Sequence, residues 1–397
     1  MVRTRVVRTV DVPDALRVSR YLKMPELGPR VLFFSGGSAL NGLCKTLKNY
    51  SHNSIHLVTA FDSGGSSAEL RQAFAMPSIG DLRSRLMSLA DETVLGHPEV
   101  YALFTYRFPK NVGNKQLKVR LEAMVAGKDP QLDEISNPMR RLIRNQLGYF
   151  LDLMPTDFDL RGASIGNLIL AGGYLNNHEH LDPIIFLFSK LVNVQGTVRA
   201  IVNDNLHLGA DLDDGSRVMG QHRLTGKEVD PLSSPVKRLF LSSSRDHYEP
   251  TEAQLRKKNR RLIESAELIC YPPGSFYTSV MANLLPSGVG RAIAANDCPK
   301  VYVPNLGADP EQIGMHCAQT VQRLLDQLAA DQPDGCANDR LLNYVLVDRE
   351  RGDYGPGIPC EQLEALGIEV IDLKLISRHS SPYYDNDLLV SALLSLT

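Results

Sequence analysis

The segment that most constrains the fold is residues 31–47, which read VLFFSGGSALNGLCKTL. Four apolar residues lead directly into Ser35-Gly36-Gly37-Ser38, and leucines at 40, 43 and 47 follow at helical spacing. This pattern predicts a strand, a tight glycine turn and a helix. Unpaired backbone N–H groups at such a turn, beside the positive end of a helix dipole, favour a bound phosphate. The alternative is that the turn only packs a helix on a sheet.

The alternation of strand-like and helix-like segments after residue 31 determines the expected fold class. Buried strands are predicted at residues 31–34, 55–61, 267–271, 300–304, 344–348 and 368–373. Helices are predicted at 81–90, 165–193, 251–266, 309–330 and 386–396. Short strands at 198–204, 206–212 and 216–221 include a hairpin turn, Asp213-Asp214-Gly215. This order predicts an α/β protein with a mostly parallel sheet and helices on both faces.

Two regions fall outside this alternation. Residues 3–12 alternate like an edge strand, within an expected N-terminal extension of residues 1–30. Residues 92–160 are helical in pattern, broken by prolines and rich in basic side chains. We interpret them as a helical insertion in a single α/β domain of residues 31–397, and as the expected contact of a possible homodimer.

The composition argues against several classes of function. The chain has 43 Lys and Arg against 45 Asp and Glu, and no Trp, which argues against a nucleic-acid partner. No apolar run approaches the ~18 residues of a membrane helix, and no long apolar segment follows the arginine-rich start. The six cysteines lack Cys-x-x-Cys spacing, so we expect free thiols in a reducing cytoplasm rather than zinc or disulfides.

A second candidate site is FDSGGSSAELR, residues 61–71. Asp62 ends a predicted strand, where an open sheet presents catalytic or metal-binding carboxylates. The run Gly64-Gly65-Ser66-Ser67 supplies backbone donors and hydroxyls, and Arg71 is placed to bind phosphate. The alternative is a flexible loop with a solvated Asp62.

A third candidate is PSIGDLRSRL, residues 77–86. Gly80 permits a tight turn, and Asp81 is expected to cap a helix whose first turn carries Arg83 and Arg85. One of these arginines would clamp a diphosphate through two hydrogen bonds. The alternative is a capped helix with surface arginines.

Later turns add further candidates. Asn167 opens the helix after GASIG and either binds a ligand or only caps. Residues 270–280, CYPPGSFYTSV, repeat the strand–turn–helix pattern, so they hold a second phosphate or a base or sugar edge, with Tyr277 stacking or donating, or else form a plain turn. Asn305 ends the strand at 300–304. His379 lies beside an arginine in a polar loop and is a weaker candidate for catalysis.

The combined chemistry favours a phosphorylated ligand. The sequence contains no motif for acyl transfer, zinc hydrolysis or protein kinase activity. What remains is a set of backbone donors, hydroxyls, arginines and one well-placed carboxylate. That set suits a nucleoside diphosphate, with Asp62 holding Mg²⁺ or accepting a proton.

Six motifs in this order resemble the 2-phospho-L-lactate transferase (CofD-like) family, which includes a gluconeogenesis-factor branch. The motifs are FSGGS, FDSGGSSAELR, PSIGDLRSRL, GNLILAGG, PPGSFYTSVMANLLPSG and VPNLG, and the resemblance spans residues 31–90 and 160–395. It implies a three-layer α/β/α Rossmann-like fold. FDSGGSSAELR and PPGSFYTS look more like the gluconeogenesis-factor branch.

The resemblance also implies residue roles and two functions. Gly36, Gly37 and Ser38 would contact phosphates, and Asp62 would hold the metal. The nucleotide crevice would be lined by Gly274, Ser275 and Tyr277 and walled by Asn167 and Asn305. One implied function is transfer of a phospholactate-type group, with Mg²⁺, from a GDP-activated donor to an acceptor hydroxyl. For this reaction we expect Asp62 with Mg²⁺, and Arg71 or Arg83, as the catalytic residues that stabilise the developing charge. The other implied function is non-catalytic binding of a UDP-sugar by a regulator of carbon metabolism and cell-wall synthesis.

Overall fold

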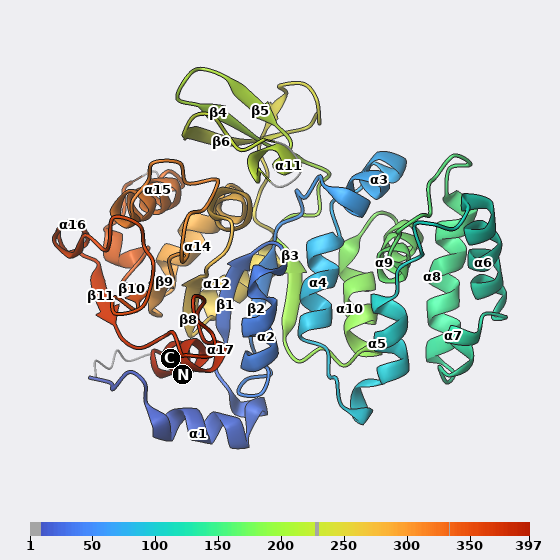
Figure 1. Cartoon of the computed structure of the whole chain (residues 1–397), viewed down its shortest axis with the longest axis horizontal. Helices are drawn as coiled ribbons and strands as arrows, with labels where there is room; N and C mark the ends of the chain where they lie inside the picture. The colour runs from blue at the N-terminus through green and yellow to red at the C-terminus, as the bar shows by residue number, and fades with distance from the viewer. Residues whose placement is uncertain (1–8, 227–229, 333) are drawn as a thin grey trace.

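A seven-stranded parallel sheet forms the centre of the protein (Figure 1). The computed structural model describes residues 9–226, 230–332 and 334–397. The strands are β1 (Val31–Ser35), β2 (Ile55–Val58), β3 (Thr197–Ala200), β8 (Leu268–Tyr271), β9 (Lys300–Tyr302), β10 (Tyr344–Val347) and β11 (Glu369–Asp372). Their order across the sheet is β11-β10-β9-β8-β1-β2-β3. All five residues of β1 are buried, because helices cover both faces of a parallel sheet.

Helices on the two faces complete a three-layer α/β/α fold of the Rossmann-like type, as predicted. In one layer, α2 (Asn41–Leu47) packs against both α4 (Gly80–Ser88) and α17 (Asn386–Ser395). In the other, α14 (Val289–Ala295) packs against both α12 (Lys257–Ser265) and α15 (Cys317–Ala329). A short helix, α16 (Cys360–Ala365), precedes the edge strand β11. None of the helices in the described ranges has both the length and the apolar character needed to span a bilayer.

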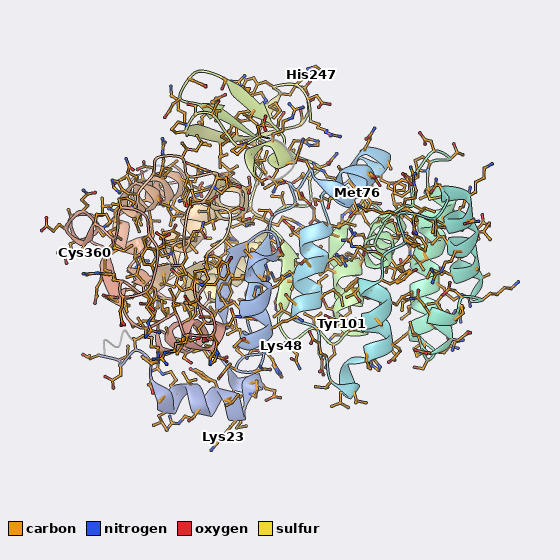
Figure 2. The ribbon with its side chains drawn as sticks, viewed as in Figure 1. Lys23, Lys48, Met76, Tyr101, His247 and Cys360 are labelled. Atoms are coloured by element: carbon orange, nitrogen blue, oxygen red, sulfur yellow. The ribbon has the colours of Figure 1, made fainter. Side chains whose placement is uncertain are left out.

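Residues 92–160 form a helical region on one side of the sheet, which confirms their predicted helical character (Figure 1). Its helices are α5 (Pro98–Thr105), α6 (Asn114–Ala126), α7 (Pro130–Asp133) and α8 (Met139–Leu153). Both α5 and α8 pack on α9 (Ile165–Asn176), which also contacts α10 (Leu181–Leu191). Glu92 connects this region to α2, because it lies 3.7 Å from Lys48 Nζ and accepts a 3.5 Å hydrogen bond from Tyr101. Figure 2 labels both of these partners.

A small antiparallel sheet lies beyond one end of the parallel strands (Figure 1). Its order is β5-β4-β6-β7, with β4 (His207–Leu212), β5 (Arg217–Met219), β6 (Val236–Ser242) and β7 (Pro250–Thr251). The expected hairpin turn at Asp213-Asp214-Gly215 joins β4 to β5, with Gly215 at a φ of 86°. His247, labelled in Figure 2, lies in the loop between β6 and β7.

The N-terminal region packs on the C-terminal helix. Helix α1 (Ala15–Lys23) contacts α17, and the backbone N–H of Asp14 donates to Ser395 Oγ at 2.7 Å. Most of the edge strand expected at residues 3–12 lies outside the described residues, and residues 9–12 are not in a strand.

Two predicted helices begin later than expected. The helix predicted at 251–266 begins at Lys257, because Pro250 and Thr251 pair with β6 and Gln254 forms a bridge with Ser287. The helix predicted at 309–330 begins at Cys317. Asp309 and Glu311 therefore do not start that helix, and their side chains instead accept hydrogen bonds from the turn after β8.

Asp309 and Glu311 cap the turn that follows β8. Glu311 Oε2 accepts from the backbone N–H groups of Tyr277 and Thr278 at 2.8 and 2.9 Å, and Oε1 accepts from Thr278 Oγ1 at 2.5 Å. Asp309 Oδ2 accepts from Phe276 N at 3.1 Å. Burial, reinforced by the negative charge of Asp309, raises the pKa of Glu311 to about 7, although its hydrogen bonds oppose this.

We predict that Glu311 makes stability fall as pH rises from about 4.5 to about 7. In this window the unfolded chain releases a proton that folded Glu311 retains, so this group lowers the unfolding free energy by up to about 1.4 kcal/mol per pH unit. Glu311→Gln removes this titration. The difference in unfolding free energy between the variant and the wild type should therefore shift in favour of the variant as pH rises. Urea unfolding at a series of pH values measures this difference, with exposed Glu134→Gln as the control. Parallel curves for wild type and Glu311→Gln would contradict it.

Candidate functional site

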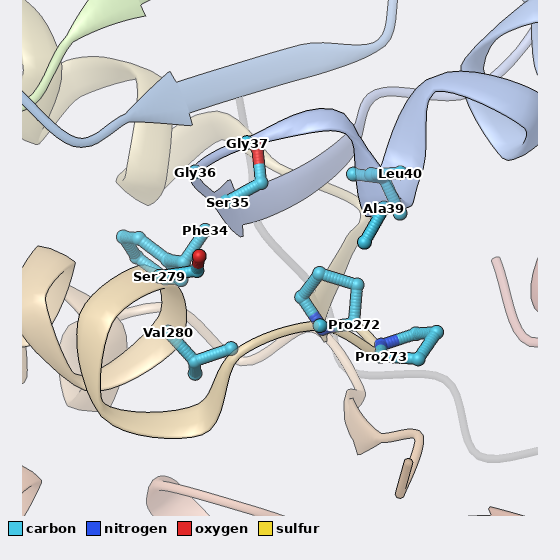
Figure 3. Close-up of a pocket in the computed structure, with 11 residues that line it drawn as sticks. Phe34, Ser35, Gly36, Gly37, Ala39, Leu40, Pro272, Pro273, Ser279 and Val280 are labelled. Atoms are coloured by element: carbon cyan, nitrogen blue, oxygen red, sulfur yellow. The ribbon is translucent and has the colours of Figure 1, made fainter. Parts of the chain in front are cut away.

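The sheet order places a crevice between β1 and β8. Strands β2 and β3 follow β1 in one direction and β9 to β11 follow β8 in the other, so connections diverge at this pair. In open α/β sheets, ligands bind at such a switch point, beyond the carboxyl ends of the strands. A small hollow of about 210 Å³ lies there, between the turn after β1 and the turn after β8. Figure 3 shows the two turns facing one another. The residues lining this hollow are Phe34, Ser35, Gly36, Gly37, Ala39, Leu40, Pro272, Pro273, Gly274, Ser279 and Val280.

Arg85 supports the first of these turns from the protein interior. Its side chain is fully buried, and its Nη2 donates to the carbonyls of Gly36 and Gly37, both at 3.2 Å. Its Nη1 donates to Asn41 Oδ1 at 3.2 Å and to Cys44 Sγ at 2.9 Å. With both carbonyls engaged by Arg85, the chain is anchored on the interior side of the turn, and a cation lies directly behind it. Gly36 also needs its small size, because a Cβ there would lie 2.5 Å from Ser279 Oγ.

A second, larger groove of about 1080 Å³, open to solvent, lies on the other side of Asp81. A Cβ on Gly37 would be 3.7 Å from Asp81 Oδ1, so the first turn borders this groove. The groove brings together three of the predicted motifs and one segment that was not predicted. Its lining is Asp62, Gly64, Gly65, Ser66, Ser67, Glu69, Gly80, Asp81, Arg83, Arg107, Lys110, Arg161, Gly162 and Asn167.

Three carboxylates line the groove: Asp62, Asp81 and the exposed Glu69. Asp62 Oδ1 accepts from Gly64 N at 3.0 Å, and its Oδ2 would lie 3.5 Å from a Cβ on Gly80. Asp81 Oδ2 accepts from Thr59 Oγ1 at 3.4 Å. We expected Asp81 to cap α4, and this prediction is wrong. Helix α4 begins at Gly80, and Ile79 occupies the capping position. The groove therefore brings Asp81, a candidate of the third motif, together with Asp62 of the second.

The groove also contains buried polar atoms without partners. Among the described residues, Asn167 Oδ1 and Arg83 Nε are buried and make no hydrogen bond. Asn167 is 1% exposed and its Nδ2 donates to Ser66 Oγ at 3.3 Å. Arg83 Nη1 donates to the carbonyl of Phe104 at 3.3 Å. Burial, followed by the nearby charge of Arg107, lowers the pKa of Arg83 to about 10.

Arg71 is placed below the groove rather than in its lining. It is 5% exposed, and its guanidinium donates to the carbonyls of Phe61, Asp62 and Leu206 at 3.1, 3.1 and 2.6 Å. It also donates to Asn205 Oδ1 at 2.9 Å. Burial lowers the pKa of Arg71 to about 10, partly opposed by Asp62. Its contacts fasten the Asp62 turn to the start of the small sheet.

The turn after β8 contributes less than the sequence suggested. Gly274 lines the small hollow, but its N–H donates to Asn305 Oδ1 at 2.6 Å. Asn305 also donates to the Gly274 carbonyl at 2.7 Å, so it pins the turn. Tyr277 is 3% exposed and directs its hydroxyl toward Val236 and Met315. Neither Ser38 nor Ser275 is among the lining residues of the two hollows.

Four cationic residues of the site were missed or left unassigned: Arg85, Arg107, Lys110 and Arg161. Arg85 was one of two arginines expected on the helix, without a decision between them. Arg107 and Lys110 belong to the helical region, which carries no motif. The only signal in the sequence is the basic character of residues 92–160, and that does not indicate which side chains reach the groove.

Fold and site together define a Rossmann-like α/β protein with a small hollow at its switch point and a polar groove beside it. The family model described as 2-phospho-L-lactate transferase CofD matches residues 31–374, and the chain belongs to this family.

Among curated relatives, the chain is 27% identical to the gluconeogenesis factor of Bacillus subtilis, over 91% of this chain and 93% of that protein. A putative gluconeogenesis factor of Thermoanaerobacterium thermosulfurigenes is also 27% identical, over 93% of this chain and 97% of that protein. A crystal structure of a UPF0052-family protein from Bacillus halodurans superposes with a TM-score of 0.67. That structure is 24% identical and matches 92% of this chain and 99% of its own, which supports the fold.

We predict that Gly166→Ala destabilises the groove wall. The added Cβ would overlap the Phe104 carbonyl and lie 2.9 Å from Arg83 Cδ, so backbone must move. We expect a loss of about 1–3 kcal/mol in unfolding free energy, typical of overpacking. Gly148→Ala in α8 is the matched control, because its nearest neighbour would be Val125 Cγ1 at 3.6 Å. Urea unfolding should show the control unchanged or stabilised by up to about 1 kcal/mol; equal effects would contradict the prediction.

Proposed function

We propose that this protein binds a nucleoside diphosphate-linked small molecule along the glycine turn after β1 and the adjoining groove. The observation that carries the proposal is that Arg71, Arg83 and Arg85 surround this region without a carboxylate partner. No carboxylate of the described residues lies within 4.0 Å of any of these three guanidinium groups. Their hydrogen bonds go to backbone carbonyls, two amide oxygens, a thiol and an imidazole.

Burying a charged side chain costs free energy unless an opposite charge offsets it. Arg85 is fully buried, and the uncharged dipoles around it compensate only part of its charge. A diphosphate at the glycine turn would supply the missing negative charge. Backbone N–H groups at a strand-to-helix turn suit the same group.

The carboxylates of the groove fit a bound Mg²⁺. Magnesium usually takes one or two carboxylates, several waters and substrate phosphates rather than a cage made only of protein ligands. Asp62 and Asp81 provide such a pair, and the described residues hold no cluster of three or more metal-ligating side chains. When bound there with a diphosphate, the ion would neutralise charge on the phosphate oxygens.

As the reaction, we propose transfer of a phosphorus-containing group to an acceptor hydroxyl. The acceptor oxygen forms a bond to the β-phosphorus of the ligand, and the bond from that phosphorus to the bridging oxygen breaks. A nucleoside monophosphate leaves, and the hydroxyl proton passes to a groove carboxylate, for which Asp62 is the candidate. Arg83 stabilises negative charge that develops on the phosphoryl oxygens.

A second candidate is a non-catalytic regulator that binds a UDP-sugar. Two observations favour it. The curated relatives at 27% identity carry the name gluconeogenesis factor. The guanidinium of Arg71, one of the candidate catalytic residues, donates its hydrogen bonds to backbone carbonyls and to Asn205 rather than toward the groove.

We predict that Asp62→Asn abolishes turnover and leaves the fold intact. The amide retains an oxygen for the Gly64 N–H, so the turn is preserved, whereas the charge for Mg²⁺ and the proton acceptor are lost. The assay follows release of nucleoside monophosphate from GDP- and UDP-linked donors with Mg²⁺. Glu69→Gln is the control, because Glu69 is an exposed carboxylate of the same groove.

Calorimetry with GDP, UDP and UDP-sugars, with and without Mg²⁺, separates the two candidates. Metal-dependent binding with turnover that Asp62→Asn removes supports the transferase. Sugar-dependent, metal-independent binding without turnover supports the regulator. Absence of binding to every nucleoside diphosphate would reject both.

A further inference from the structure

A short two-stranded ribbon carries cations from the helical region to the groove. Arg107 and Ser164 form an antiparallel bridge, and the backbones of Phe108 and Gly162–Ala163 exchange hydrogen bonds of 2.9 and 3.1 Å. Arg107 Nη1 donates to the Gly162 carbonyl at 3.2 Å. The stem of Lys110 lies over Gly162, with Cε 3.1 Å from the position of a Cβ there. Both cations are thus held at the groove by backbone contacts.

These two cations face the part of the groove that contains the unpartnered atoms. Arg83 Nε and Asn167 Oδ1 are buried without a hydrogen bond among the described residues. Arg107 lies close enough to Arg83 for their like charges to repel, and the structure gives neither Arg107 nor Lys110 an ion pair with a described carboxylate. Three cations and one buried amide oxygen therefore line one groove, and none of the three cations forms an ion pair with the described carboxylates Asp62, Glu69 and Asp81 of that groove.

Arg161 lines the same groove but differs in one respect. Its guanidinium makes paired hydrogen bonds to Asp159, at 3.0 and 2.7 Å, so its charge is already balanced. It is exposed, like Arg107 and Lys110. Arg161 is therefore a natural reference for the effect of removing one positive charge from this rim.

We propose that Arg107 and Lys110, with Asn167, form a second anion subsite beside Arg83 that binds a carboxylate or phosphate on the group linked to the nucleoside diphosphate. This inference rests on the proposed function, because it assigns the far end of the same ligand. The diphosphate lies at the Gly36–Gly37 turn in front of Arg85, on the other side of Asp81. Asn167 Oδ1 accepts a hydrogen bond from a hydroxyl beside the anionic group. The ligand therefore carries negative charge at both ends of the groove.

The test compares ligands that differ only in this charge. UDP-glucuronate and UDP-glucose share every group except a carboxylate, and GDP-mannuronate and GDP-mannose form the corresponding guanosine pair. The charged member would gain two charge-assisted contacts, from Arg107 beside the half-buried Arg83 and from Lys110. We therefore expect the wild type to bind the charged member about tenfold more tightly. Arg107→Gln and Lys110→Gln should each reduce that preference to within about threefold, while the affinity for UDP or GDP alone stays unchanged.

Arg161→Gln is the matched control and should retain the full preference, because it removes the same charge from a residue already paired. Equal binding of the charged and neutral sugars by the wild type would overturn the subsite while leaving the proposed function intact. So would an equal loss of UDP affinity in Arg107→Gln, which would place the diphosphate itself at these cations. Absence of binding to all nucleoside diphosphates would reject the proposed function and the subsite with it. Urea unfolding of each variant verifies that the fold is retained.

Discussion

The parallel pairing of β1 with β2 on one side and β8 on the other determines where every other part of the site lies. Because all three strands point the same way, the turns after them meet at one edge of the sheet. The registers place Ser35 beside Val58 and Phe33 beside Cys270, so the glycine turn emerges between its neighbours. The Asp62 turn follows β2, and α4 then brings Asp81, Arg83 and Arg85 back across the same edge. An antiparallel β8 would carry its turn to the opposite edge and leave the crevice open on one side.

The two turns that face one another at this crevice have opposite electrostatic surroundings. The turn after β8 leads into a helical segment, Phe276–Met281, whose first N–H groups already donate to Asp309 and Glu311. The turn after β1 has Arg85 behind it. A helix N-terminus that is satisfied by carboxylates offers little to a phosphate, whereas a glycine turn backed by a cation attracts one. A diphosphate is thus expected on the β1 side, and the β8 side acts as a wall.

Sequence patterns predicted the fold well where the pattern was periodic and local. The buried run at 31–34 and the leucines that follow it indicated β1 and α2, and the alternation of elements indicated the parallel sheet. The two late helix starts failed because tertiary pairing overrode local preference. Pro250 and Thr251 joined a sheet edge, and Asp309-Pro310-Glu311, a strong capping pattern, was used to cap a different helix. A capping motif identifies a chemistry but not the helix that receives it.

The candidate site, like the fold, was predictable from the sequence only where the signal is local. Glycine and serine turns after strands can be recognised in a sequence as candidate binding turns, because small residues are required where backbone approaches a ligand. Long side chains do not. Arg71, Arg83 and Arg85 look alike in the sequence, yet one fastens a loop, one lines the groove and one is buried behind the turn.

The helical region supplies long basic side chains that the turns of the parallel sheet do not provide. A sheet edge can present turns and short carboxylates, but its reach is limited to residues near the strand ends. Helices α5 and α8 pack on α9, and the ribbon at 106–108 and 162–165, which leads into α9, lies against the groove. The region that carries the basic side chains is therefore also rigidly tied to Asn167, because α9 begins at the end of that ribbon. A change in this region can alter which ligand end is recognised while the turn in front of Arg85 stays as it is.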